Sequence, residues 1–180
     1  MIPKKTPYQD LCQSLDEARE RSRVYRSQCA FFAGQFARQL ADFLKTPPDR
    51  ITYEALSGAR AGEGAVQAHE AMQINDDTYW HIGLRLQLAS EKAKDSVLLQ
   101  VRFKNMGDDA RPLYVINLFG HEDFELSEPT PTAFEPVFEE IYESLKRHYE
   151  DGLRLFLDKR GQNLHMPFTA ARQGEIAGEG

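Results

Sequence analysis

Histidine side chains are the first candidates for chemistry in this sequence. The chain has five of them: His69, His81, His121, His148 and His165. None stands in a spaced metal motif such as His-Glu-x-x-His. If the strands predicted below bring His69, His81 and His121 to one sheet face, these three could bind a divalent metal or transfer protons. Surface or helix-capping histidines are the simpler interpretation.

Two arginines could add an anion site to the same face. Arg85 and Arg102 occupy outward-facing positions of two predicted strands, close to Tyr79. Guanidinium and aromatic groups together could hold an anionic small molecule or a peptide carboxylate. The alternative is a solvated sheet face. The predicted ligand site therefore consists of His69, His81, His121, Arg85 and Arg102, and no cofactor or resident metal is expected.

Other catalytic motifs are missing from the sequence. No serine or cysteine stands in a Gly-x-Ser-x-Gly elbow, and the glycine-rich loop at 57–64 lacks the Lys-Ser/Thr of a phosphate-binding loop. Cys12 and Cys29 lie 17 residues apart on one predicted helix, too far apart to form a disulfide with each other. We expect Cys29 in the core and Cys12 partly exposed. The protein is not expected to be an enzyme.

A long helix over residues 6–45 should position everything that follows. Thr6, Pro7 and Gln9 form a helix start with a capping box. Apolar or small residues then recur every three or four positions, from Tyr8 to Phe43. The apolar stripe is broad after Cys29, where it includes Phe31, and narrow before it. The second half should therefore face a core and the first half should be largely exposed.

The length of this helix raises the question of a partner. About 39 residues span nearly 60 Å, whereas a compact 180-residue domain is about 40 Å across. Either the helix breaks near residues 20–27, or another chain covers the narrow seam. The predicted interface residues are Leu11, Leu15, Tyr25, Arg19 and Arg23.

Five strands are predicted between the helices, and their short connections favour an antiparallel meander. The strands cover residues 50–56, 65–74, 78–89, 96–106 and 112–119, with a short helix as the alternative over 65–74. In the third strand Trp80, Ile82, Leu84 and Leu86 should face the core. A cavity between helix and sheet, lined by Phe32, Phe36 and Trp80, is a further possibility, although such aromatics more often fill a core.

A second helix should close the domain. Residues 120–131 are interpreted as an acidic connection, after which Thr132 and Glu135 predict a capping box and a helix to about residue 160. The fold class is therefore α+β, with one domain at 1–160 and a tail at 161–180 that Leu164, Met166 or Phe168 could anchor. This order resembles cystatin-like folds, in which a sheet wraps a long helix, and the resemblance carries no function.

Charge is unevenly distributed along the chain, whose net charge is −6. Residues 1–50 carry nine basic and six acidic side chains, whereas 121–158 carry three and eleven. The first and last helices could therefore pair within one chain or between chains. Nucleic-acid binding is not expected, and the lack of a signal peptide or membrane span predicts a cytoplasmic location. The predicted function is a protein-binding or assembly subunit, as a homodimer or in a hetero-complex. The alternative is a small-ligand- or metal-binding protein that could be hydrolytic.

Overall fold

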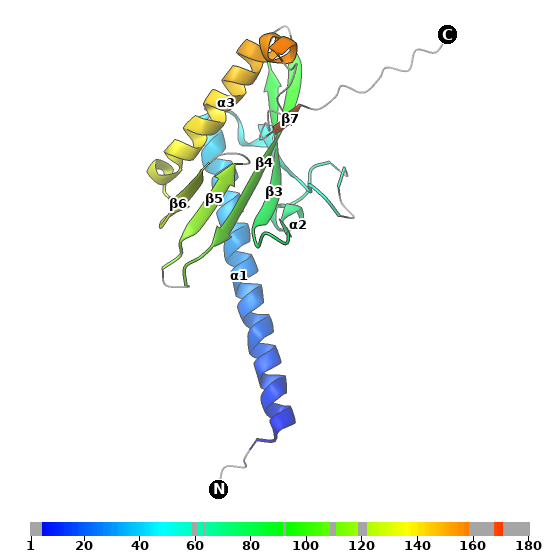
Figure 1. Cartoon of the computed structure of the whole chain (residues 1–180), viewed down its shortest axis with the longest axis vertical. Helices are drawn as coiled ribbons and strands as arrows, with labels where there is room; N and C mark the ends of the chain where they lie inside the picture. The colour runs from blue at the N-terminus through cyan, green and yellow to red at the C-terminus, as the bar shows by residue number, and fades with distance from the viewer. Residues whose placement is uncertain are drawn as a thin grey trace, which may run out of the picture.

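The protein is described from a computed structural model, which covers residues 5–58, 61–62, 64–91, 93–108, 111–118, 122–158 and 168–170. Figure 1 shows a long helix, a twisted sheet and a second helix, in the α+β class predicted above. The elements in chain order are α1 (Pro7–Phe43), η1 (Pro48–Arg50), β1 (Ile51–Glu54), α2 (Ala68–Ala71), β2 (Gln73–Ile74), β3 (Trp80–Ala89), β4 (Lys94–Asn105), β5 (Tyr114–Leu118), β6 (Asp123–Leu126), α3 (Pro131–Asp158) and β7 (Phe168–Ala170).

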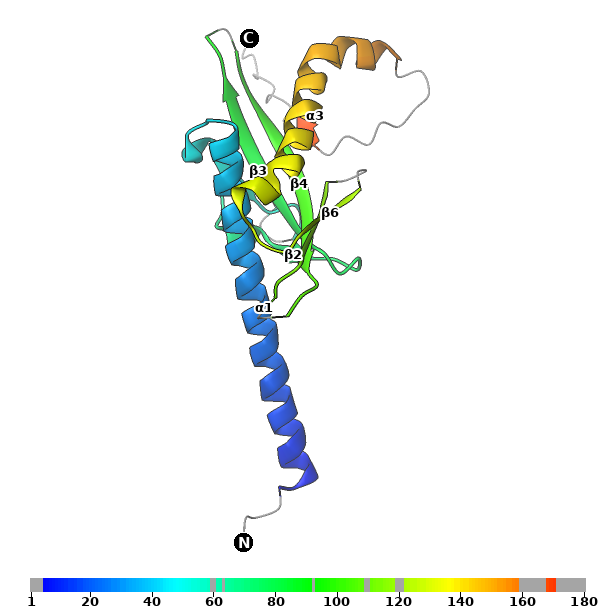
Figure 2. The same cartoon turned by 90° about the vertical axis from the view of Figure 1, so that its left-hand side faces the viewer.

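Helix α1 is continuous, so it does not break near residues 20–27. The predicted capping box is present: the Gln9 amide donates to Thr6 Oγ1 at 3.3 Å, and the Thr6 amide donates to Gln9 Oε1 at 2.9 Å. Buried side chains begin only at Cys29. The first half of the helix therefore extends beyond the sheet, as Figures 1 and 2 both show.

Helix α1 is followed by Lys45, a residue with an unusual backbone conformation. The Lys45 amide donates to the Asp42 carbonyl at 3.3 Å and the Thr46 amide to the Ala41 carbonyl at 3.0 Å, which is the Schellman arrangement. Lys45 has a φ of 53°. This left-handed conformation favours glycine and costs a side-chain-bearing residue about 1–2 kcal/mol.

The sheet is antiparallel throughout, with the order β1-β3-β4-β5-β6; β2 also pairs with β3, and β7 with β4. The register sets Ile82 opposite Val101 and Leu84 opposite Leu99, and all four are buried, so the predicted inward face of β3 is confirmed. The prediction of a single strand over residues 65–74 was wrong, because α2 and the two-residue β2 occupy most of this range. An isolated bridge between Tyr53 and Val66 also lies in it. The connection predicted at 120–131 contains β6, which pairs with β5.

Gly83 shows how closely the chain packs at the β1 edge of the sheet. A Cβ atom added there would lie 2.6 Å from the Glu54 carbonyl oxygen and 2.9 Å from Leu56 Cδ2. Only glycine at this position lets the chain at the end of β1 approach β3 so closely.

Helices α1 and α3 cover one face of the sheet, and aromatic rings fill the space between the layers. Phe32 stacks on Tyr114 with ring centroids 3.9 Å apart and also contacts Phe103 and Phe134. Phe36 contacts Phe134, and Trp80 is buried in the same core. These rings fill the core rather than line a cavity. Phe31, expected on the core side, is 64% exposed.

In the C-terminal part of the chain, the structure differs from the sequence-based predictions at two places. The α3 cap is Thr130, whose Oγ1 accepts from the Ala133 amide at 3.3 Å; the predicted cap, Thr132, lies inside the helix. Within the predicted tail, residues 168–170 form β7, with Phe168 opposite Leu99. Leu164 and Met166 lie outside the described residues. None of the described helices is long and apolar enough to span a bilayer.

Candidate functional site

The first candidate site is the part of α1 that extends beyond the domain, which we call the projecting segment (residues 7–24). Every residue from 7 to 23 is exposed, over a length of about 25 Å. Tyr8, Leu11 and Leu15 are 75%, 70% and 51% exposed. Their spacing of three and four residues places them on one face of the helix. Among the described elements none covers this face, as Figure 2 shows.

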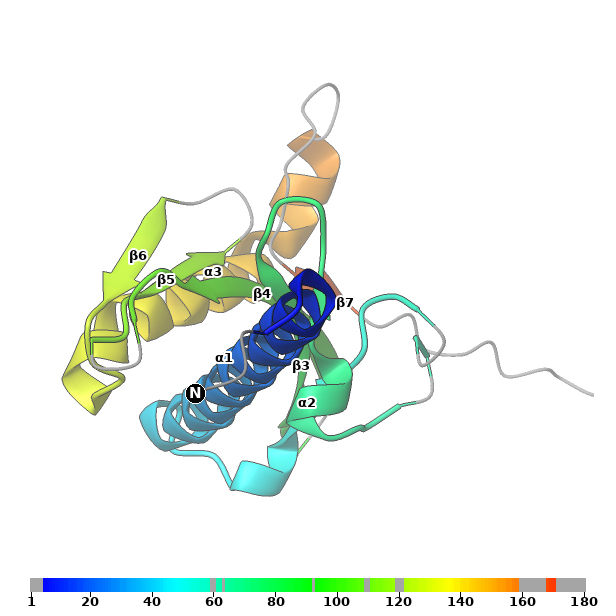
Figure 3. The same cartoon turned by 90° about the horizontal axis from the view of Figure 1, so that it is seen from below.

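Two further exposed apolar residues lie at the sheet end nearest to this segment. Met106, directly after β4, is 62% exposed, and Ile74 in β2 is 56% exposed. Tyr25 connects this end of the sheet to α1: its hydroxyl donates to the Asn105 carbonyl oxygen at 3.4 Å, and its ring lies 6.5 Å from that of Trp80, the residue opposite Ile74. In Figure 3 the projecting segment points toward the viewer with the sheet behind it.

Tyr25 therefore differs from the other predicted interface residues. It is half-buried against its own domain rather than free for a partner. Leu11, Leu15 and Arg19 are exposed, and exposed Arg23 donates to Glu20 in a pair with N–O distances of 2.6 and 2.9 Å. The surface offered by the projecting segment consists of Tyr8, Leu11 and Leu15, extended by Ile74 and Met106, which the sequence analysis did not single out.

Charge is polarised along α1 from residue 7 to residue 26, two residues beyond the projecting segment. Residues 7–17 carry three acidic side chains and no basic one, and residues 18–26 carry four arginines and one glutamate. Among the described residues no carboxylate of the acidic helix α3 pairs with these arginines. The ring contacts of α3 with α1 involve Phe32, Phe36 and Phe43. The ring contacts hold α3 against the second half of α1, beyond the arginines.

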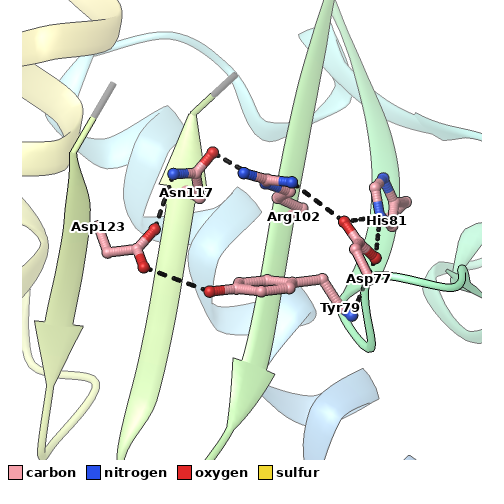
Figure 4. A network of polar contacts seen from close by, with 6 residues as sticks. All are labelled: Asp77, Tyr79, His81, Arg102, Asn117 and Asp123. Carbon is pink, nitrogen blue, oxygen red and sulfur yellow. Dashed lines mark hydrogen bonds and ion pairs between the residues drawn. The ribbon is translucent and has the colours of Figure 1, made fainter. Parts of the chain in front are cut away.

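The second candidate site is a polar network on the sheet face away from the helices (Figure 4). His81 Nε2 lies 2.9 and 3.0 Å from the two Asp77 carboxylate oxygens, and Arg102 Nη1 donates to Asp77 Oδ2 at 3.0 Å. Arg102 Nε donates to Asn117 Oδ1 at 2.8 Å, and Asn117 Nδ2 donates to Asp123 Oδ1 at 2.7 Å. The network therefore links the turn before β3 to β4, β5 and β6.

Tyr79 completes this network beneath the chain of hydrogen bonds. Its hydroxyl donates to Asp123 Oδ2 at 3.3 Å. The Arg102 guanidinium lies 5.0 Å and Lys104 Nζ 4.4 Å from its ring centroid, which are cation–π distances. Burial acts to raise the pKa of Asp77, but hydrogen bonds from His81, the Tyr79 amide and Arg102 outweigh it, so this pKa lies below its usual value.

The predicted ligand residues are distributed unevenly around this network. His81 and Arg102 belong to it, whereas His69 is an exposed residue of α2 whose carbonyl oxygen accepts from Arg26 at 3.2 Å. Arg85 is paired with Glu54 across β1 and β3, at 2.5 and 2.9 Å. His121 lies outside the described residues. Ligand binding by the five predicted residues stays a prediction. Carboxylates of the chain itself already form ion pairs with both arginines.

Sequence reasoning missed two members of the network, Asn117 and Asp77. Asp77 lies in the turn before β3, where its carboxylate contacts both His81 and Arg102. The one available signal was a carboxylate placed just before an alternating strand that carries a histidine. Within the described residues no group of three or more His, Cys, Asp or Glu side chains could hold a metal ion.

No protein-family model, curated protein or solved structure matches this chain.

Proposed function

We propose that this protein is an assembly subunit that binds protein through the projecting segment of α1, and that its partner is a second copy of the chain. The observation that supports this most strongly is the exposed apolar stripe of Tyr8, Leu11 and Leu15 on a continuous helix that leaves its own domain. Helices whose stripes are not covered by their own domain are characteristic of helix–helix association.

The charge pattern favours a self-complementary pair. In an antiparallel arrangement the acidic residues 7–17 of one copy lie opposite the basic residues 18–26 of the other. A two-fold axis then repeats each contact twice, as in most homodimers. Opposite charges flanking an apolar seam select this orientation over the parallel one, which would bring like charges together. The small residues Ala18 and Ser22 continue the stripe and allow close approach of the helices.

Replacing Leu15 with aspartate tests this proposal. The substitution puts a charge in the middle of the seam, so we expect the dissociation constant of the dimer to rise at least about tenfold. At protein concentrations where both proteins are monomeric, the domain itself should unfold at an unchanged temperature, because residue 15 contacts none of the core. Sedimentation velocity over a range of protein concentrations measures the first effect and circular dichroism the second.

Gln13→Asp is the matched control for this measurement. Gln13 is exposed on the same segment but about half a turn around the helix from the stripe, and the substitution adds the same charge. We expect it to leave the dimer nearly unchanged. Equal weakening by both substitutions would mean that general repulsion, and not the seam, governs association.

A further inference from the structure

A groove lies at the opposite end of α1 from the projecting segment. Its volume is about 550 Å³, within the range of pockets that bind drug-sized molecules. It forms where the end of α1, the outer part of β3 and the middle of α3 meet. The apolar lining consists of Leu44, Pro47, Leu86, Leu88, Ala89, Tyr142, Leu145 and Tyr149.

Burial divides the lining into a floor and a rim. Leu86 is 2% and Leu145 is 6% exposed, so their side chains form the floor. Tyr142 and Tyr149, at 44% and 46%, are the large exposed apolar residues among those of α3 whose side chains the structure describes, and they stand seven residues apart on one face of that helix. The Tyr149 hydroxyl donates to Asp95 Oδ2 at 2.8 Å, which fixes the ring beside the groove.

The charged side chains that line the groove are all basic. Lys45, Arg50 and Lys146 line the groove, and no acidic side chain does so among the described residues. Lys45 and Lys146 are exposed, so their ammonium groups lie at the rim. Within the described part of the chain none of the three forms an ion pair. In contrast, Arg85 and Arg102 form ion pairs with carboxylates of the chain.

Lys45 has an unusual backbone conformation. It occupies the left-handed C-terminal position of α1, at a φ of 53°, where glycine would be more stable. The chain thus keeps a basic side chain at the groove at a cost to the helix end. Backbone strain of this kind is a reason to look for a function of the residue that bears it.

We propose that the groove binds a small amphipathic carboxylate, with its hydrocarbon body on Leu86, Leu88 and Leu145 and its carboxylate between Lys45 and Lys146. Apolar contact with the floor supplies most of the affinity, and the rim lysines select the anion. Arg50 adds a third positive charge on the side of β1. This site is independent of the dimer seam, since the two lie at opposite ends of α1.

The test uses three ten-carbon probes at concentrations where they are monomeric: decanoate, decan-1-ol and decyltrimethylammonium. Isothermal titration calorimetry of the full chain should show saturable one-to-one binding of decanoate, at least tenfold tighter than that of the alcohol. The cation should not bind. The double variant K45Q/K146Q should weaken decanoate at least tenfold and change the alcohol less than twofold. Arg111→Gln, an exposed basic residue outside the groove lining, is the control and should change neither.

Lys45→Gly separates binding from stability. It should raise the melting temperature by relieving the left-handed backbone, and at the same time weaken decanoate binding. A purely structural lysine would change the melting temperature alone, and that result would contradict the proposal. Equal affinity for all three probes, no saturable binding of decanoate, or unchanged binding in K45Q/K146Q would overturn it. Binding to phosphatidylglycerol vesicles without binding of decanoate would assign the basic rim to a membrane surface and overturn it as well.

Discussion

Replacing Phe32 with alanine is expected to lower the free energy of unfolding by about 3–5 kcal/mol. Phe32 is 1% exposed and lies at the centre of the aromatic core. Its ring stacks on Tyr114 at 3.9 Å and packs on Phe103 and Phe134, so it joins α1 to β4, β5 and α3 at once. Removing the ring leaves a cavity that rigid neighbours from three other elements cannot easily fill. Urea denaturation followed by circular dichroism measures the change.

Phe31 provides a control of the same residue type on the same helix. It is adjacent in sequence but 64% exposed, because one residue turns a helix by about 100°. Phe31→Ala should change the free energy of unfolding by less than about 0.5 kcal/mol. Similar losses from both substitutions would mean that α1 does not present the face described here to the sheet.

Stability should fall in alkaline solution because the Cys29 thiol is buried. Burial raises the pKa of this thiol from 9.0 to about 11. Below pH 9 the thiol is protonated in both the folded and the unfolded chain. Between pH 9 and 11 the unfolded chain loses the proton while the folded chain keeps it, so the unfolded state is favoured progressively. The loss should reach about 2–3 kcal/mol near pH 11.

Two cysteine variants isolate this effect. Cys29→Ala removes the titrating thiol, so its stability should be lower at neutral pH but should fall less than that of the parent protein between pH 9 and 10. Some loss should remain and should grow above pH 10, because burial also raises the pKa of Tyr25 and Tyr53, and raises that of Tyr114 and Tyr149 to about 12. Cys12→Ser changes the exposed cysteine and should keep the full drop. Urea denaturation at a series of pH values provides the comparison. A drop in Cys29→Ala as steep as in the parent protein would contradict this assignment.

Local patterns were sufficient to predict much of the fold. The capping box at Thr6 and the repeat of apolar residues give α1, and strict alternation from Trp80 gives β3 and its inward face. These features depend on neighbours in sequence, so periodicity detects them. The same reasoning placed Phe31 in the core, because an aromatic beside a broad stripe cannot be assigned to one side from sequence alone.

The errors involve short elements. β6 has four residues, Asp123–Leu126, with two acidic side chains, and its strand conformation comes from pairing with β5. Helix α2 also has four residues, too few for a periodic pattern, although Gln67 and Glu70 form a capping box there. Tertiary contacts decide such segments, because the intrinsic preferences of four residues are weak.

The candidate sites depend on register and on distant contacts. The pairing of Arg85 with Glu54 requires Thr52 to lie opposite Arg85, which no local pattern specifies. The basic groove brings Lys45 and Lys146 together from positions 101 residues apart. In contrast, the exposed seam of α1 was visible in the sequence, because both its apolar spacing and its excess length are local properties.

Sedimentation velocity on the unmodified protein tests the central claim most directly. The chain has a mass of 20.6 kDa. If the projecting segments pair, the sedimenting mass should approach twice this value as protein concentration rises, and Leu15→Asp should shift the transition to higher concentration. A single species of 20.6 kDa at every concentration, for the parent protein and the variant alike, would contradict assembly through α1.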